Sequence, residues 1–250
     1  MDRAALDAAY NNSAAVQGSA GIVADWRRRS DALRASAREL RYGPAERNRI
    51  DLFEAAPGAP LLVFIHGGYW QMREKETFAF LAAGPLAHGV SVALPGYTLA
   101  PEKRLDGIVA EIRAALDLLG RPLYVCGWSA GGHLTAMMMD HPNVRGGLAI
   151  SGIFDLEPIR LCYLNEKLQL DAEEMLRNSP LRGPRIEKPL VVAYGDAELP
   201  ELQRQSKEFA ARFGHRLLPL GGHDHFSILE ELASPAGVLS AAVRTLAGGL

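Results

Sequence analysis

The 250-residue chain has little of three things: cysteine, net charge and long hydrophobic runs. Its two cysteines, Cys126 and Cys162, are too few for a disulfide framework. A formal net charge of -2 gives no reason to expect nucleic acid or an anionic membrane as a partner. No apolar run is long enough to cross a bilayer, and residues 1–13 lack the apolar core of a signal peptide. We therefore expect a cytoplasmic protein without a membrane segment.

What the chain does have is a regular alternation of strand patterns and helix patterns. This alternation predicts an α/β fold, with a doubly wound, mostly parallel sheet and helices on both faces, in a single domain over residues 1–250. A helical N-terminal arm is expected over 1–40, and a small cap of short helices over 154–188, where the regular pattern is interrupted. Strands are expected at 49–53, 61–65, 90–94, 123–126, 147–152, 189–194 and 216–220, and the longer helices at 74–88, 104–119, 199–213, 226–232 and 236–246.

Ser129 lies at the centre of the most informative stretch, residues 123–133 (LYVCGWSAGGH). An apolar strand pattern leads into Gly127, Trp128 and Ser129, and a helix pattern follows Gly131. This is the G-x-S-x-G arrangement, in which small residues on either side of the serine let the chain turn sharply and expose the hydroxyl. The same letters also fit an ordinary glycine-rich turn, so the chemistry depends on whether a base and an acid accompany the serine.

A serine nucleophile needs a histidine base and an orienting carboxylate, and in this kind of fold the acid and then the histidine follow the serine along the chain. His223 and His225 both lie in the loop after the last predicted strand, and we favour His225 because Phe226 beside it can anchor the loop. Asp196 and Glu198 both follow the strand predicted at 189–194. We favour Glu198, three residues beyond the glycine that ends this strand, and Asp196 remains the alternative.

Residues 66–70 (HGGYW) follow an early buried strand and are candidates for binding an oxyanion. Glycines there let backbone N–H groups point at a carbonyl oxygen that becomes negative in a tetrahedral intermediate. We expect the oxyanion donors to be the N–H groups of Gly68, Tyr69 and Ala130. We also expect Tyr69, Trp70 and Trp128 to line an aromatic substrate pocket. The histidines show no second cluster with metal-ligand spacing, so neither a metal nor another cofactor is expected.

The motifs HGGYW at 66–70 and GWSAGGHL at 127–134 together resemble the hormone-sensitive-lipase-like branch of the α/β-hydrolases, and more narrowly the kynurenine formamidases, or arylformamidases. The narrower resemblance rests on YTLAP at 97–101, SGIFDLEPI at 151–159, PELQRQS at 200–206 and the pair His225-Phe226. It implies an α/β-hydrolase fold with Ser129 as the nucleophile, His225 as the base and Glu198 as the acid, at a position where the family often has aspartate. It also implies hydrolysis of an aryl formamide, such as N-formylkynurenine to kynurenine and formate, without a cofactor.

Two other functions stay open at this point. Many esterases share the HGG and G-x-S-x-G motifs, so a general carboxylesterase acting on short acyl or aryl esters is the first alternative. A non-catalytic binding protein on the same fold is the second, although such proteins typically lose a member of the catalytic triad. The expected partner is a small-molecule amide or ester, and whether the chain forms a homodimer is open.

Overall fold

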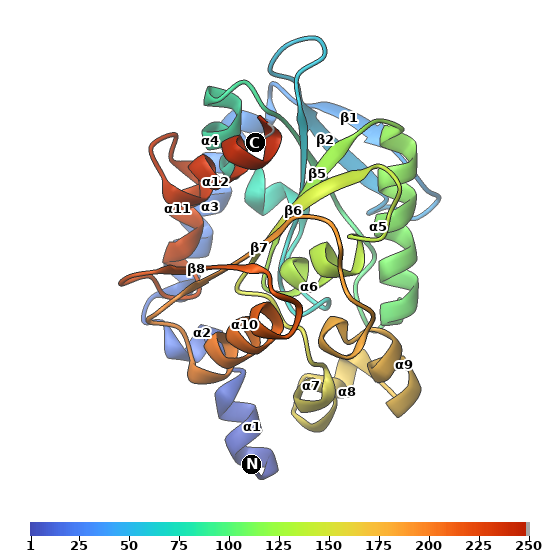
Figure 1. Ribbon diagram of the computed structural model, residues 1–250, viewed down its shortest axis with the longest axis vertical. Helices are drawn as coiled ribbons and strands as arrows, with labels where there is room; N and C mark the ends of the chain where they lie inside the picture. The colour runs from blue at the N-terminus through green and yellow to red at the C-terminus, as the bar shows by residue number, and fades with distance from the viewer. Residues whose placement is uncertain (249–250) are drawn as a thin grey trace.

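The computed structural model describes residues 1–248, in which eight strands form one sheet in the order β1-β2-β4-β3-β5-β6-β7-β8 (Figure 1). The strands from β3 to β8 are parallel, whereas β1 and β2 run antiparallel to their neighbours at one edge. The strand bounds are β1 Arg38–Arg41, β2 Arg49–Phe53, β3 Leu61–Ile65, β4 Ser91–Pro95, β5 Leu123–Trp128, β6 Val144–Ile150, β7 Leu190–Gly195 and β8 Arg216–Leu220.

Helices cover both faces of this sheet, and each face has its own apolar core. Successive side chains of a strand point to opposite faces, so Val63 and Val125 enter one core while Phe64 and Cys126 enter the other. The first core is covered by α5 (Leu105–Leu119), α6 (Ala130–Met137) and α10 (Pro200–Phe213). The second is covered by α3 (Ser19–Arg34), η1 (Lys75–Ala82), α4 (Ala83–Ala87), α11 (Glu230–Ala233) and α12 (Val238–Ala247), several of which gather on one side of the sheet in Figure 1. The predicted doubly wound, mostly parallel sheet with helices on both faces is therefore confirmed.

The helices are mostly short, apart from three that run for several turns. Their bounds are α1 Arg3–Ala9, α2 Asn12–Ala15, α3 Ser19–Arg34, η1 Lys75–Ala82, α4 Ala83–Ala87, α5 Leu105–Leu119, α6 Ala130–Met137, α7 Glu157–Leu161, α8 Asn165–Leu168, α9 Ala172–Arg177, η2 Pro180–Arg182, α10 Pro200–Phe213, η3 Ser227–Leu229, α11 Glu230–Ala233 and α12 Val238–Ala247. The stretch predicted as one helix at 74–88 is mainly the 3-10 helix η1, with one turn of α-helix after it.

The helical arm predicted over residues 1–40 ends earlier than expected. Its last helix stops at Arg34, and Arg38–Arg41 form the edge strand β1, paired antiparallel with β2. Only Leu40 of this strand packs against the core, so its sequence carries little strand signal. Backbone hydrogen bonds offered by β2 decide the conformation here, because tertiary pairing overrides a weak local preference for helix.

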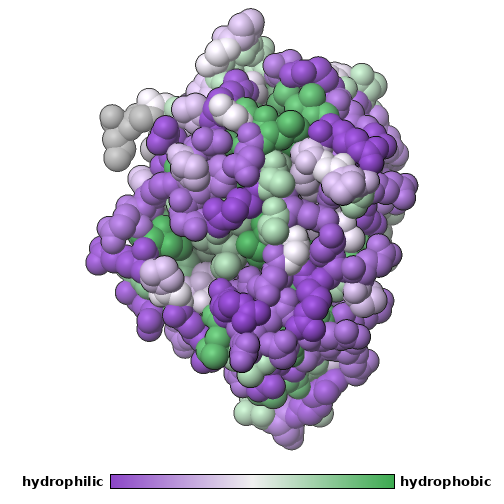
Figure 2. Space-filling model, turned by 90° about the vertical axis from the view of Figure 1, so that its right-hand side faces the viewer, coloured by the Kyte–Doolittle hydropathy of each residue, from purple (hydrophilic) through white to green (hydrophobic). Residues whose placement is uncertain are grey.

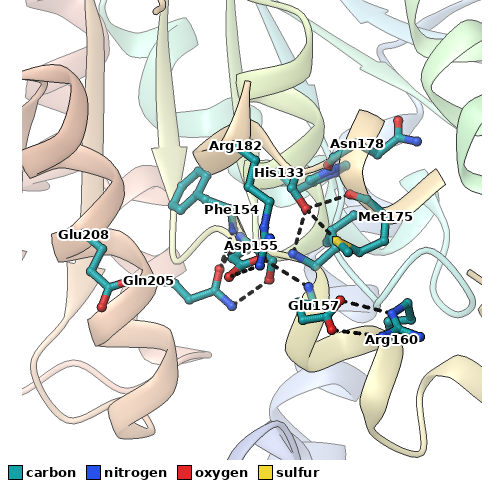
Figure 3. Close-up of polar contacts among 12 residues, drawn as sticks. His133, Phe154, Asp155, Glu157, Arg160, Met175, Asn178, Arg182, Gln205 and Glu208 are labelled. Carbon is teal, nitrogen blue, oxygen red and sulfur yellow. Dashed lines mark hydrogen bonds and ion pairs between the residues drawn. The ribbon is translucent and has the colours of Figure 1, made fainter. Parts of the chain in front are cut away.

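Gln205 of α10 ties the segment predicted as a cap, residues 154–188, to the body of the fold (Figure 3). Its side-chain oxygen accepts hydrogen bonds from the N–H groups of Phe154 (2.6 Å) and Asp155 (2.7 Å), and its Nε2 donates to the Asp155 carbonyl oxygen (3.1 Å). Arg182 returns to the Asp155 carboxylate at 3.0 Å. The segment consists of the short helices α7, α8, α9 and η2. Because Gln205 is fully buried, these bonds fix the place where the segment leaves β6.

Figure 2 shows the face of the molecule that carries α5 and α9. Most of it is hydrophilic, and the hydrophobic residues form small patches separated by polar side chains. Scattered apolar residues of this kind are ordinary on a protein surface and do not by themselves mark a binding site. Within residues 1–248, no helix combines the length and the apolar character needed to span a membrane.

Candidate active site

Ser129 lies at the apex of the turn between β5 and α6, with a backbone φ of 58°. This left-handed value costs a residue with a side chain about 1–3 kcal/mol, so it persists only where the surroundings impose it. The Ser129 N–H donates to the Ile150 carbonyl oxygen at 2.8 Å. A Cβ atom on Gly127 would lie 2.2 Å from the Gly131 carbonyl oxygen, and one on Gly131 would lie 1.9 Å from that of Ile65. The glycines on either side of the serine are therefore required by backbone contact.

His225 and Glu198 form a buried pair, with 3.0 Å between Nδ1 of the imidazole and Oε2 of the carboxylate. The second carboxylate oxygen, Oε1, accepts hydrogen bonds from the Ser151 hydroxyl at 2.5 Å and from the Gly195 N–H at 2.7 Å. An ionised carboxylate only accepts, so Nδ1 of His225 carries the ring proton and Nε2 is left with a free lone pair. This is the tautomer that a general base needs.

Asp196 and His223, the alternatives that the sequence leaves open, have other partners. Asp196 is exposed, and its Oδ1 accepts a hydrogen bond from the Gly222 N–H at 2.6 Å. The Nε2 atom of His223 lies 3.4 Å from Oε1 of Glu231. The geometry thus favours the glutamate after β7 as the partner of the buried imidazole.

Trp128 connects the turn at Ser129 to the loop that carries His225. Its Nε1–H donates to the His225 carbonyl oxygen at 2.8 Å, and its ring centroid lies 4.8 Å from that of the imidazole. The indole is buried and meets Trp26 edge-on, with 5.7 Å between centroids.

Within residues 1–248, no hydrogen bond joins the Ser129 hydroxyl to the imidazole. Catalytic hydrogen bonds of unliganded enzymes often form only when substrate binds, so the missing bond does not argue against His225 as the base.

The loop after β3 approaches the serine turn closely because it contains Gly67 and Gly68. A Cβ atom on Gly67 would lie 2.7 Å from the Trp128 carbonyl oxygen and 3.0 Å from Cβ of Ser129. Gly68 has a φ of +118°, and Tyr69 a φ of 49°, so the chain turns sharply at the point where the oxyanion donors are predicted. Ala130, the third predicted donor, begins α6, where a backbone N–H has no acceptor within its own helix. The three predicted donors therefore lie in two segments, the loop after β3 and the start of α6, and these two segments meet at the Ser129 turn.

His66 supports this loop from inside the protein. Its Nδ1 lies 2.8 Å from the Gly67 carbonyl oxygen, and its ring stacks on Tyr97 with 4.2 Å between centroids. The Tyr97 hydroxyl donates to the His66 carbonyl oxygen at 3.0 Å. Burial lowers the pKa of His66 to about 4, so the ring is neutral near pH 7 and donates from Nδ1. His66 therefore shapes the oxyanion loop without carrying a charge.

Trp70 lies in the interior of the protein and not on a pocket wall. It is fully buried, and its Nε1–H donates to Nδ1 of His133 at 3.2 Å. His133, whose pKa burial lowers to about 4, donates in turn from Nε2 to the Asn178 carbonyl oxygen at 2.7 Å. Full burial places Trp70 beneath the site, whereas the pocket-lining roles of Tyr69 and Trp128 stay predictions. Large indoles whose N–H groups find protein acceptors are more favourably packed beneath the site than exposed at its wall.

The N-terminal arm reaches the site through Tyr10 and Asn12. The Tyr69 hydroxyl donates to the Tyr10 carbonyl oxygen at 2.6 Å and accepts from Nδ2 of Asn12 at 2.8 Å. The Tyr10 hydroxyl accepts from Nε2 of Gln205 at 2.8 Å and donates to Glu201 at 3.2 Å. The arm is thus anchored both to the oxyanion loop and to α10.

A pocket of about 150 Å³ borders the histidine–glutamate pair. The arm forms one side of this pocket, and the start of α10 forms the other. Sites that enclose a drug-sized ligand measure roughly 300–1,000 Å³, so this pocket encloses only part of such a ligand, for example the reacting amide or ester group. The residues that line it beside His225 and Glu198 include Asn12, Ala15, Val16, Leu199 and Pro200.

Sequence reasoning missed three side chains that shape the site: Asn12, Ser151 and Gln205. Ser151 directly follows β6, at the carboxyl edge of a parallel strand, where ligand-binding side chains of such sheets gather. That position could have identified it. Asn12 and Gln205 lie in helices and reach partners distant in the sequence, so no local pattern marks them.

The two cysteines do not compete with Ser129 as nucleophiles. Both are buried and free, and burial raises the pKa of the Cys126 and Cys162 thiols. A thiol that stays protonated is a poor nucleophile. Within the described part of the chain, no group of three or more His, Cys, Asp or Glu residues is placed to hold a metal ion.

Comparison with known proteins shows the family. The model of the alpha/beta hydrolase family matches residues 62–212. Kynurenine formamidase of Danio rerio is 32% identical over 238 residues, which cover 84% of this chain and 81% of that protein. Kynurenine formamidase of Salmo salar is 34% identical over 221 residues, which cover 76% of this chain and 75% of that protein. A crystal structure from Silicibacter sp. TM1040, provisionally assigned as a thioesterase, is 32% identical and superposes with a TM-score of 0.90 over 96% of this chain and 99% of that chain. These similarities agree with the strained serine turn and confirm the family expected from the motifs: the chain belongs to the alpha/beta hydrolase family and is a hydrolase related to the kynurenine formamidases.

Proposed function

We propose that the chain hydrolyses an aryl formamide, with N-formylkynurenine as the substrate and kynurenine and formate as the products. The observation that carries the proposal is the buried pair of His225 and Glu198 beside the strained turn at Ser129, in a chain 32% identical to a kynurenine formamidase over 84% of its length. The pocket at the imidazole has room for the reacting formamide group, which is the formyl carbon together with its nitrogen.

The reaction starts when the Ser129 hydroxyl oxygen attacks the formyl carbon and Nε2 of His225 takes the hydroxyl proton. Glu198 stabilises the imidazolium through Nδ1, and N–H groups of the oxyanion loop and of α6 donate to the negative oxygen. One such donor is typically worth about 3 kcal/mol of transition-state stabilisation. The carbon–nitrogen bond then breaks, and His225 gives its proton to the leaving amine, which leaves a formyl ester on Ser129. His225 next takes a proton from water, which attacks the ester, and then gives this proton to the Ser129 oxygen as the carbon–oxygen bond breaks and formate leaves.

Hydrolysis of N-formylkynurenine and of p-nitrophenyl acetate, by the wild type and by Ser129→Ala, tests the proposal. We expect strong formamide turnover by the wild type and a loss of at least about 10⁴-fold in the variant, because the nucleophile is gone. Circular dichroism of the variant controls for folding. Turnover of the ester alone would replace the formamidase by a general carboxylesterase, the alternative that shares the same catalytic groups. Formamide turnover that survives in Ser129→Ala would contradict the proposed nucleophile.

We also propose a cytoplasmic location, a small-molecule partner and no nucleic-acid partner. The two free cysteines support a reducing compartment, where disulfides rarely form. The formal net charge of -2 provides no positive surface field for a polyanion. Homodimer formation stays a prediction, which light scattering of the purified chain would test.

A further inference from the structure

The hydrogen bonds around Tyr69 determine how the side-chain amide of Asn12 is oriented. The Tyr69 hydroxyl lies 2.6 Å from the Tyr10 carbonyl oxygen, which can only accept, so the single hydroxyl proton is used there. Asn12 lies 2.8 Å from the same hydroxyl oxygen and must therefore present its Nδ2 donor to it. The carbonyl oxygen of the amide, Oδ1, is then directed away from Tyr69.

This Oδ1 atom of Asn12 is an acceptor without a donor. Within residues 1–248 it has no hydrogen-bond partner, although the atom is shielded from solvent and the residue is only 4% exposed. Leaving a buried polar atom unpaired costs about 1–3 kcal/mol, and native proteins keep few such atoms. An acceptor that is buried and unpaired, on a residue that lines a pocket, is explained if a ligand brings the donor.

Asn12 is connected to the oxyanion loop through a side chain and shares a pocket with the catalytic histidine. It is hydrogen-bonded to Tyr69 of the oxyanion loop, and it lines the same pocket as His225. When a substrate carbonyl is held by the oxyanion donors and attacked by Ser129, its leaving group must lie beside the imidazole that protonates it. In a formamide, the donor available at that place is the N–H of the leaving nitrogen.

We infer that Asn12 is a specificity-determining residue whose Oδ1 accepts a hydrogen bond from the amide N–H of the formamide. This inference rests on the proposed formamidase activity. In an ester the leaving atom is an oxygen that carries no hydrogen. Its lone pair faces Oδ1, and two acceptors cannot form a hydrogen bond. A site that provides a partner for a substrate N–H discriminates against the analogue that lacks this group, because the buried acceptor then stays unpaired.

The same hydrogen bond favours the chemical step. As the carbonyl carbon becomes tetrahedral, the nitrogen loses its amide resonance and becomes pyramidal. Its lone pair has to turn toward His225 to receive the proton, and its N–H turns away from the imidazole. An acceptor that meets the N–H in this arrangement binds the transition state more strongly than the planar amide and so raises kcat. Esters have no N–H to turn and gain nothing from it.

A purely structural role of Asn12 makes a different prediction. If Asn12 only anchors the arm to Tyr69, its loss misplaces the oxyanion loop and slows amides and esters alike. The ratio of amide to ester turnover separates the two roles, because the specificity role lowers this ratio and the structural role leaves it unchanged.

The test measures kcat/KM for formanilide and phenyl formate, which share the acyl group and the ring and differ only in N–H against O. Asn12→Ala should lower the amide-to-ester ratio about tenfold or more. Tyr10→Phe is the matched control: it removes the hydroxyl that anchors the arm to Gln205 and Glu201 and keeps the bond between Asn12 and Tyr69, so it should change both substrates in the same proportion. Ester turnover by each variant shows that it is folded.

An unchanged ratio in Asn12→Ala, with a wild type that hydrolyses formanilide, overturns the inference and leaves the proposed function standing. A wild type that hydrolyses phenyl formate but neither formanilide nor N-formylkynurenine overturns the proposed function and the inference with it. Should Asn12→Ala fail to fold, Asn12→Gln keeps the amide but displaces its oxygen by one carbon. A loss confined to the amide substrate in Asn12→Gln supports the inference, and an equal loss on both substrates contradicts it.

Discussion

Replacing Glu198 by glutamine should stop catalysis by changing the tautomer of the histidine. Oε1 of Glu198 is held by two donors, the Ser151 hydroxyl and the Gly195 N–H, whereas Oε2 faces Nδ1 of His225. In Glu198→Gln the amide oxygen stays with the two donors, which puts the NH₂ group against His225. Nδ1 must then accept, so the ring proton moves to Nε2, the atom that has to accept the proton of Ser129.

The position of the His225 ring proton determines how much activity Glu198→Gln loses. In Ser-His-Asp hydrolases, the change of the carboxylate to an amide lowers kcat about 10⁴-fold through the wrong tautomer. That factor equals about 5 kcal/mol of transition-state stabilisation. We expect a loss of the same order for Glu198→Gln on N-formylkynurenine, with little change in KM, because Glu198 is only 5% exposed. Steady-state kinetics measures both constants, and thermal unfolding monitors the fold. Activity within tenfold of the wild type would refute the assignment of Glu198 as the acid.

Asp196→Asn is the matched control, since it makes the same chemical change two residues away. Asp196 is exposed and accepts a hydrogen bond from the Gly222 N–H, a role that an amide oxygen can also fill. We expect its kcat to stay within about threefold of the wild type, as is usual for a surface substitution. An inactive Asp196→Asn beside an active Glu198→Gln would make Asp196 the acid.

Gly131→Ala should destabilise the protein by about 1–3 kcal/mol or prevent folding, because the new Cβ would lie 1.9 Å from the backbone oxygen of Ile65. Gly21 lies in the exposed part of α3, where no atom is within 4 Å of an added Cβ, so Gly21→Ala should stabilise the protein by about 0.5–1 kcal/mol. Urea denaturation of both variants measures the two changes in the free energy of unfolding. Burial lowers the pKa of His66 and His133 from 6.5 to about 4, so between these values the folded chain binds fewer protons than the unfolded chain. The free energy of unfolding should therefore fall by about 2 kcal/mol for each histidine from pH 7 to pH 5, and an unchanged urea midpoint would contradict this.

Local chemistry in the sequence was enough to predict the alternating elements, the turn at Ser129 and the candidate base His225. Apolar strand patterns identify the central strands because those strands are buried on both faces, and the glycines next to Ser129 are required by contacts a few residues away in the chain or in the adjoining strand. Glu198 could be favoured from its place after β7, but Asp196 has the same chemistry and nearly the same place. No property of either residue alone separates the two.

Only the tertiary structure decided what lies around these residues. It brings Glu198 to His225 across 27 positions of the chain and Ser151 to Glu198 across 47, and it packs Trp70 beneath the loop that was expected to expose it. It also places Asn12, from an arm without a distinctive pattern, against Tyr69. Periodicity and turn chemistry act between near neighbours, so a sequence displays them directly. The partners of a buried polar atom depend on how distant segments pack, and no local pattern contains that information.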